Sequence, residues 1–322
     1  MNKYFSLFFA CTLWIAAAPH AAPAEESVAD DQALLMVVMD PLSKPLSCDC
    51  VRGYAQRDYQ LLADHIARSI DRPVDVHWYE SLTEAKAELK REPDLVIGKD
   101  SVVRVDAGRI GVPMMAVASL SGRDGSTTMR GLIVVRRDDP ARSAEDLAGY
   151  RLLFGPTDSE EKSSAIEAYL KSQKVAIDSS RKRFNACSEA SAALMDLPTD
   201  QPFAAVISSY AEPLLEGCGN IKQGDLRVIA KTDPVPFVTA FVRESSSANQ
   251  RAAIKSALSD AGTDPKLLIG LETLSGFVPY KFDRPTSTQT KSASSDARAT
   301  SGNRATVGDR AITASKKKPL RD

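Results

Sequence analysis

Short apolar runs alternate with amphipathic stretches along most of the chain. Residues 33–40 (ALLMVVMD) form a continuous apolar run of strand length, and residues 56–70 carry apolar side chains at helical spacing. Residues 74–80 alternate between apolar and polar, as a strand does. Residues 81–92 predict a helix in which Ser81 is the N-cap and a glutamate three residues later completes a capping box. This part of the chain therefore predicts two strand–helix units.

The same alternation continues through the middle of the chain. Further strands are predicted over residues 94–98, 112–119, 131–137, 151–155, 204–209, 226–232 and 237–243. Helices are predicted over residues 163–173 and 249–260. A short helix is predicted between a cap at Ser143 and a stop at Gly149. Repeated strand–helix units with continuous apolar strands are typical of an α/β fold with largely parallel sheets.

The composition is that of a soluble globular protein. The chain has 322 residues, of which 43% are hydrophobic and 26% charged, and this length predicts about two domains. Its 41 Lys and Arg residues nearly balance its 42 Asp and Glu residues, which argues against a dedicated nucleic-acid-binding protein. We therefore expect no nucleic-acid partner.

Motifs of the common enzyme classes are absent from the sequence. It has no glycine-rich phosphate loop, no G-x-S-x-G and no C-x-x-C. His65 lies in a predicted helix and His77 in a predicted strand, where a structural role is the ordinary one. We expect no enzymatic activity, no catalytic residue and no cofactor.

The two ends of the chain differ in composition from the part between them. Residues 1–24 place a lysine before an apolar run and end in small residues, the pattern of a secretory signal peptide cleaved after Ala24. Residues 283–322 are rich in Ser, Thr, Ala, Lys and Arg and poor in large apolar residues, so we expect a disordered tail. Residues 281–322 hold ten Lys and Arg against four Asp, and this basic tail either contacts an anionic surface or has no specific partner.

Several separated segments of the chain resemble one family of binding proteins. Residues 130–165 contain VVRR at the end of a predicted strand, followed by SAEDLAG and then FGPTDS. Four other segments agree in order, at residues 79–103, 204–219, 226–243 and 271–280. Over roughly residues 33–280 the chain resembles type II periplasmic solute-binding proteins. More narrowly, it is similar to the phosphate/phosphite/phosphonate-binding family of ABC transporter components.

The resemblance implies a two-lobe α/β fold with two hinge crossovers. The first lobe would comprise residues 25–126 plus 238–282, and the second residues 127–237. A small, anionic, phosphonate- or phosphate-like solute would bind between the lobes and pass to the membrane permease of an ABC transporter. The protein would be a periplasmic monomer. The alternative is a periplasmic accessory or sensory protein on the same scaffold that serves a partner enzyme or receptor, with a redox or metal role for Cys48 and Cys50.

Anions in such folds bind where strand ends meet helix N-termini, because backbone N–H groups and the helix dipole favour negative charge there. The candidate ligand-binding residues implied by the resemblance are Tyr79, Ser81, Lys99, Ser101, Thr157, Ser159, Ser209 and Tyr210, with Asp40 and Ser208 at neighbouring strand ends. Ser81 is alternatively a plain helix cap, Tyr79 a packing residue, and Lys99 a solvated cation. Residues 158–162, with three acids and one lysine, are expected to form a solvated first turn.

Four cysteines follow the predicted signal peptide. An even number in an exported protein suggests disulfides. Cys187 and Cys218 both fall in the second lobe implied by the resemblance, and we expect a disulfide between them. Cys48 and Cys50 are only two residues apart, so a bridge between them would be strained. They are a possible redox or disulfide pair; a soft-metal site is the weaker alternative, and we expect no metal.

Overall fold

The computed structural model describes residues 32–47, 51–52, 55–177, 182–198 and 201–282. The chain divides into residues 1–282 and residues 283–322, and the second unit lies outside the described residues. The predicted signal peptide (1–24), the predicted disordered tail (283–322) and the Cys48/Cys50 pair also lie outside them. Among the described residues, no helix is both long enough and apolar enough to span a membrane.

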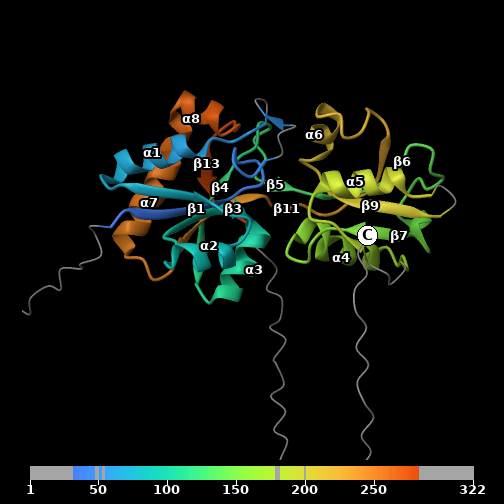
Figure 1. Ribbon diagram of the computed structural model, residues 1–322, viewed down its shortest axis with the longest axis horizontal. Coiled ribbons are helices and arrows are strands. Elements are labelled where there is room, and N and C mark those ends of the chain that lie inside the picture. Colours follow the sequence, from blue (N-terminus) through green and yellow to red (C-terminus); the bar gives the residue numbers. More distant parts are fainter. Residues whose placement is uncertain (1–31, 48–50, 53–54, 178–181, 199–200, 283–322) are drawn as a thin grey trace, which may run out of the picture. The chain divides into compact units, whose positions relative to one another are not determined.

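The described part of the chain contains a six-stranded sheet with the order β13-β4-β12-β3-β1-β2 (Figure 1). Its strands are β1 (Leu34–Met39), β2 (Val74–Trp78), β3 (Leu95–Lys99), β4 (Met114–Leu120), β12 (Val238–Arg243) and β13 (Phe277–Pro279). The helices of this half are α1 (Tyr59–Ile70), α2 (Leu82–Leu89), α3 (Asp100–Ile110), α7 (Ala248–Asp260) and α8 (Pro265–Gly270), with the short 3₁₀ helix η4 (Ala261–Thr263). We call this half the first lobe.

A five-stranded sheet with the order β10-β6-β9-β7-β8 forms the second lobe within the same described residues. Its strands are β6 (Gly131–Arg136), β7 (Arg151–Phe154), β8 (Lys182–Arg183), β9 (Phe203–Ser208) and β10 (Leu226–Lys231). Its helices are α4 (Ser164–Ser172), α5 (Cys187–Asp196) and α6 (Glu212–Gly217), with the 3₁₀ turns η2 (Glu145–Leu147) and η3 (Glu160–Lys162).

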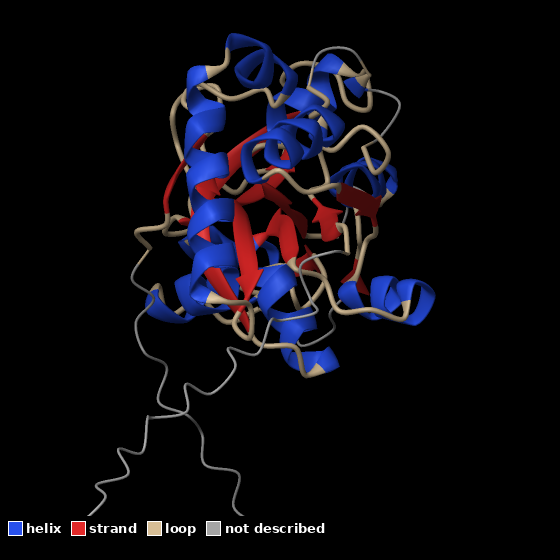
Figure 2. Cartoon of the chain, turned by 90° about the vertical axis from the view of Figure 1, so that its left-hand side faces the viewer, coloured by secondary structure: helices blue, strands red, loops and turns tan. Residues whose placement is uncertain are grey.

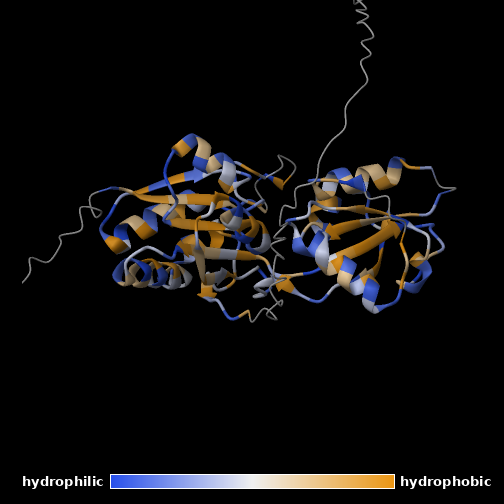
Figure 3. Ribbon diagram, turned by 90° about the horizontal axis from the view of Figure 1, so that it is seen from below, coloured by the Kyte–Doolittle hydropathy of each residue, from blue (hydrophilic) through white to orange (hydrophobic). Residues whose placement is uncertain are grey.

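The continuous apolar strands are explained by helices on both faces of each sheet. In β1, Met36 and Val38 pack with α1 and α7, whereas Val37 and Met39 pack with α2 and α3. Both faces of the strand are therefore buried, and no position in it favours a polar side chain. Figure 2 shows helices enclosing the strands, and Figure 3 shows hydrophobic residues along the strands.

Two connections join the sheets, and they pair with each other. β5 (Thr128–Met129) lies on the way from β4 to β6, and β11 (Val235–Pro236) lies on the way from β10 to β12. The two short strands run antiparallel, with Val235 opposite Met129. The predicted α/β fold with two crossovers is confirmed, whereas the exact lobe boundaries at residues 126–127 and 237–238 stay a prediction.

The sheets are mixed rather than largely parallel, and this part of the prediction is wrong. β12 runs antiparallel to both β3 and β4, and β6 runs antiparallel to β9 and β10. The reason lies in the crossovers. Val238, the first residue of β12, pairs with Lys99, the last residue of β3. The returning chain enters the sheet at the carboxyl edge of the parallel strands and must run the opposite way.

The hydrophobic pattern located most strands but missed helices α3, α5, α6 and α8. α3 shows why, because three of its eleven residues are valines, which favour strands. Only the face with Val103 and Ala107 is buried against the sheet. The helix ends at Gly111, whose φ of 68° is a left-handed conformation suited to glycine.

Candidate functional site

The candidate site is built from strand ends. β3 ends at Lys99 and β9 ends at Ser208. β6, the strand after the first crossover, begins with Gly131 opposite Ser208, as β12 begins opposite Lys99. The carboxyl edges of both sheets therefore lie at the connections between them, where polar side chains from the two lobes can meet.

Lys99 and Glu161 form a buried ion pair that links the two lobes. The Nζ of Lys99 lies 2.5 Å from Oε1 of Glu161 and donates a second hydrogen bond of 2.9 Å to Oγ of Ser159. Ser208 donates to the same Glu161 oxygen at 2.5 Å. Glu161 and Ser208 are 0% exposed and Lys99 only 5%, so the pair is shielded from water. The Lys99 ammonium and the Ser208 hydroxyl thus converge on one carboxylate oxygen.

The neighbouring residues of the same turn also contact the first lobe. The backbone N–H of Glu160 donates to Oγ of Ser101 at 3.1 Å, in the first turn of α3. Asp158 lies 3.6 Å from the guanidinium of Arg109 near the other end of that helix. The turn that carries three acidic residues therefore contacts α3 near both of its ends, and Arg109 offsets the charge of Asp158.

The predicted solvated first turn over residues 158–162 is wrong, because Glu161 and Lys162 are buried. Two glycines make this burial possible. A Cβ on Gly131 would collide with the carbonyl oxygen of Glu161, and a Cβ on Gly155 would lie 2.5 Å from Cβ of Lys162. The backbone of Gly155 also donates to the carbonyl of Lys162 at 3.1 Å. The turn therefore packs directly on the ends of β6 and β7.

The local electrostatics keep Glu161 ionised. Burial by itself raises the pKa of Glu161, but the charge of Lys99 and the hydrogen bonds from Lys99 and Ser208 outweigh it. The net result is a pKa below the ordinary value. A carboxylate in this position is an anion held by protein donors.

Lys162 is a second buried cation in the site. Its Nζ donates to the backbone carbonyl of Asn185 at 2.9 Å, and its side chain is 4% exposed. Burial lowers the pKa of Lys162, and the charge of Lys99 shifts it in the same direction. The charges of the two ammonium groups therefore disfavour each other, and a nearby anion would offset both.

A second buried polar group lies after β1. Asp40 is 0% exposed, and its Oδ2 accepts hydrogen bonds from Arg57 at 2.8 Å and from the hydroxyl of Tyr59 at 2.6 Å. Burial raises the pKa of Tyr59 well above its ordinary value, and the charge of Asp40 adds to this shift. Asp40 and Arg57 therefore neutralise each other.

The charges of both polar groups act on Tyr210. Its ring stacks on Phe237 with the centroids 4.7 Å apart, and the guanidinium of Arg57 lies over the same Phe237 ring at 5.3 Å. Burial raises the pKa of Tyr210 well above its ordinary value, and the charges of Glu161 and Asp40 add to the shift. The phenol is therefore a neutral group that can donate a hydrogen bond.

The structure brings some of the predicted residues together and separates others. Lys99, Ser101, Ser159 and Tyr210 all belong to the cluster around Glu161, and Thr157 lies exposed on the same turn. Three predicted residues have partners elsewhere, and these are Tyr79, Ser81 and Ser209.

Each of these three residues has a structural partner. The hydroxyl of Tyr79 donates to Glu88 at 3.0 Å. Ser81 is the N-cap of α2 and accepts from the N–H of Glu84 at 3.2 Å, which is its predicted alternative role. Ser209 accepts from the N–H of Arg130 at 3.0 Å.

Sequence reasoning missed Glu161, Lys162, Arg57 and Tyr59 as members of the cluster. No local pattern marks Glu161, because its burial depends on Gly131, which lies thirty positions earlier on another strand. Arg57 carries a weak signal, since it is a charged residue near the start of the predicted amphipathic helix.

Cys187 and Cys218 are both free thiols, so the predicted disulfide between them is wrong. The sulfur of Cys187 is buried at the start of α5 and accepts a hydrogen bond of 3.4 Å from the N–H of Ser208. Cys218 follows α6, and its thiol is directed to the carbonyl of Leu215 at 3.6 Å. Each thiol therefore has its own hydrogen-bond partner. An even number of cysteines does not show that any two of them lie close together.

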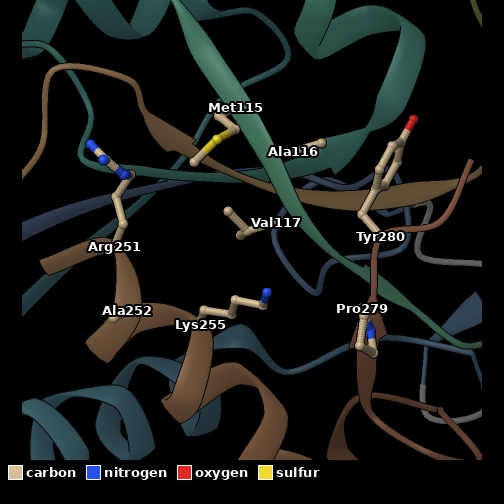
Figure 4. A pocket seen from close by; sticks show the side chains of 8 residues that line it. All are labelled: Met115, Ala116, Val117, Arg251, Ala252, Lys255, Pro279 and Tyr280. Atoms are coloured by element: carbon tan, nitrogen blue, oxygen red, sulfur yellow. The ribbon is translucent and has the colours of Figure 1, made fainter. Parts of the chain in front are cut away.

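The described residues also form pockets away from this cluster. Within the described residues no three His, Cys, Asp or Glu side chains are grouped so as to hold a metal ion. Figure 4 shows a pocket of about 250 Å³ on the first lobe, with Tyr280 at one side and Arg251 and Lys255 from α7. The guanidinium of Arg251 donates a hydrogen bond of 3.0 Å to the backbone carbonyl of Glu244, so one of its donors already has a partner. None of the residues that line this pocket belongs to the cluster around Glu161.

Two α/β lobes joined by two crossovers, with a polar cluster at the strand ends, define the class of two-lobe periplasmic binding proteins. Solved structures with this fold include XAC2383 from Xanthomonas citri bound to ATP, at 18% identity and a TM-score of 0.59 over 77% of this chain and 91% of that chain. PhnD1 from Prochlorococcus marinus in complex with methylphosphonate is 14% identical, with a TM-score of 0.55 over 77% of this chain and 93% of that chain.

A binding protein component of an ABC phosphonate transporter from Pseudomonas aeruginosa is also similar. It is 15% identical, with a TM-score of 0.57 over 78% of this chain and 82% of that chain. The family model of the periplasmic substrate-binding protein of phosphonate ABC transporters matches residues 54–284. The chain belongs to this family, as its sequence segments indicated. No curated protein matches the sequence.

Proposed function

We propose that the protein captures a small oxyanion of the phosphonate or phosphate class at the cluster around Lys99. The observation that carries the proposal is the Lys99 ammonium, which is buried at a strand end and held by acceptors from the other lobe. A buried ammonium needs a negative partner, and such a partner contributed by a ligand would draw the two lobes together.

Further groups in the cluster suit an oxyanion. Lys162 supplies a second buried positive charge, and the hydroxyls of Ser159, Ser208 and Tyr210 supply donors. Ser101 and Thr157 lie at the edge of the same region. The first turn of α3 adds the positive end of a helix dipole.

The cellular role follows from the family. Substrate-binding proteins of ABC transporters are periplasmic and deliver a small solute to a membrane permease. In this proposal the chain is exported by residues 1–24, works as a monomer, and binds its ligand without chemical conversion. It has no nucleic-acid partner.

The test is a calorimetric titration of the purified protein with methylphosphonate, phosphate, sulfate and acetate. We expect saturable binding of at least one of the phosphorus oxyanions and loss of that binding in Lys99→Met. Lys171→Met, which removes an exposed lysine of α4, serves as the matched control and should bind as the parent does. Absence of binding for every oxyanion, or equal binding by Lys99→Met, would overturn the proposal.

A further inference from the structure

We propose that Glu161 is a built-in competitor of the ligand, whose carboxylate occupies the anion position of the site and must leave before a doubly charged oxyanion can bind. The inference rests on the proposed function and deepens it, because it concerns how the same site selects its ligand.

The contacts of Glu161 are those expected of a bound anion. Its Oε1 receives the Lys99 ammonium from the first lobe and the Ser208 hydroxyl from the second, both at 2.5 Å. The carboxylate is 0% exposed. A ligand oxygen in the same place would find the same donors, so ligand and side chain cannot occupy the position together.

The second oxygen of the carboxylate is not satisfied. Oε2 of Glu161 is buried and has no hydrogen-bond partner among the described residues. A carboxylate offers about four acceptor positions, and a buried acceptor without a donor is unfavourable. The side chain is therefore an imperfect occupant, which a better-matched anion can displace.

Lobe separation would release the position. Lys99 belongs to β3 of the first lobe, whereas Glu161 lies in η3 of the second. The hydrogen bond between Ser101 and the N–H of Glu160 also crosses between the lobes. Opening would break these contacts together and expose the ammonium of Lys99 to an incoming anion.

The charges of the cluster indicate which ligand can take the place of Glu161. Asp40 and Arg57 neutralise each other, Lys99 is the ion-pair partner of Glu161, and the charge of the buried Lys162 also acts on the Glu161 carboxylate. With the carboxylate displaced, Lys99 loses its ion-pair partner, and the charge of Lys162 is no longer offset by Glu161. A doubly charged tetrahedral oxyanion balances the charges of both lysines. A carboxylate ligand carries only the single charge that Glu161 already supplies.

The first experiment compares methylphosphonate affinities of the parent, Glu161→Gln and Glu145→Gln at pH 8 by calorimetry. Glu145 is an exposed acid of the same lobe and provides the matched loss of charge. We expect Glu161→Gln to bind at least tenfold more tightly than the parent and Glu145→Gln to stay within twofold. Equal or weaker binding by Glu161→Gln, with the parent still binding, would overturn the inference and leave the proposed function standing. Absence of methylphosphonate binding in the parent and in Glu161→Gln would overturn the inference and the proposed function together.

The second experiment is anion rescue of Glu161→Ala, which leaves room for a small anion. We expect a melting temperature below that of the parent, and a rise on adding methylphosphonate that is at least twice the rise seen with the parent. Acetate should rescue less than methylphosphonate. Equal responses of the two proteins to methylphosphonate would overturn the inference. If Glu161→Ala does not fold, the affinities of Glu161→Gln decide the question.

Discussion

The rings of Tyr210 and Phe237 stack at an interplanar angle of 17°. Tyr210 follows β9 of the second lobe, whereas Phe237 precedes β12, the strand that returns to the first lobe. The carbonyl of Phe237 also accepts the N–H of Asp100 at the start of α3, at 2.8 Å. One aromatic pair thus joins a strand end, a crossover and the helix beside the candidate site.

Truncating this ring should destabilise the protein. Phe237→Ala removes a buried aromatic side chain together with its contacts to Tyr210 and Arg57, and we expect a loss of about 3 kcal/mol in the free energy of unfolding. Phe237→Leu keeps most of the apolar volume and should lose less than half as much. Urea denaturation of the three proteins measures both values, and a loss under about 1 kcal/mol for the alanine variant would show that the stack is not structural.

The ion pair between Lys99 and Glu161 should behave as a buried pair. Lys99→Met leaves a buried carboxylate without its cation, and we expect about 3–5 kcal/mol of destabilisation. The double variant Lys99→Met/Glu161→Leu removes both charges and should recover most of this loss. A double-mutant cycle from denaturant unfolding gives the coupling energy, and additive effects of the two changes would contradict the pairing.

Two glycines should respond in opposite directions to a single methyl group. A Cβ on Gly131 meets the backbone carbonyl of Glu161, so Gly131→Ala displaces the turn and lowers both stability and ligand affinity. Gly108 lies within α3 with nothing within 4 Å of the added Cβ, and Gly108→Ala should stabilise the helix by up to about 1 kcal/mol. Thermal unfolding of both variants tests this, and a neutral Gly131→Ala would show that the turn is not packed as described.

The stability of the protein should depend on the ionisation of Glu161. Its pKa in the folded state lies below the unfolded value of about 4.3, because Lys99 and Ser208 outweigh the effect of burial. The resulting stabilisation is fully present above about pH 5 and is lost as the pH falls through the folded-state pKa. The parent should therefore lose stability more steeply than Glu161→Gln between pH 6 and pH 3. Parallel pH profiles from urea unfolding would contradict this assignment.

The sequence predicts strands such as β1, β3, β6 and β9 well because each is a run of apolar residues that is buried on both faces. It predicts Lys99 and Ser159 as site residues because both follow strands that end at the same edges. It cannot predict the burial of Glu161, which requires Gly131 and Gly155 to bring two strand ends against one turn. Cys187 and Cys218 show the same limit, since their shared lobe does not determine which groups their thiols contact.

The most direct measurement is a crystal structure of the protein grown with saturating methylphosphonate. Displacement of Glu161 predicts that the contact between its carboxylate and Lys99 is broken and that a phosphonate oxygen lies within hydrogen-bond distance of the Lys99 ammonium. An intact ion pair, with the phosphonate bound elsewhere on the chain, would contradict both the site and the role of Glu161.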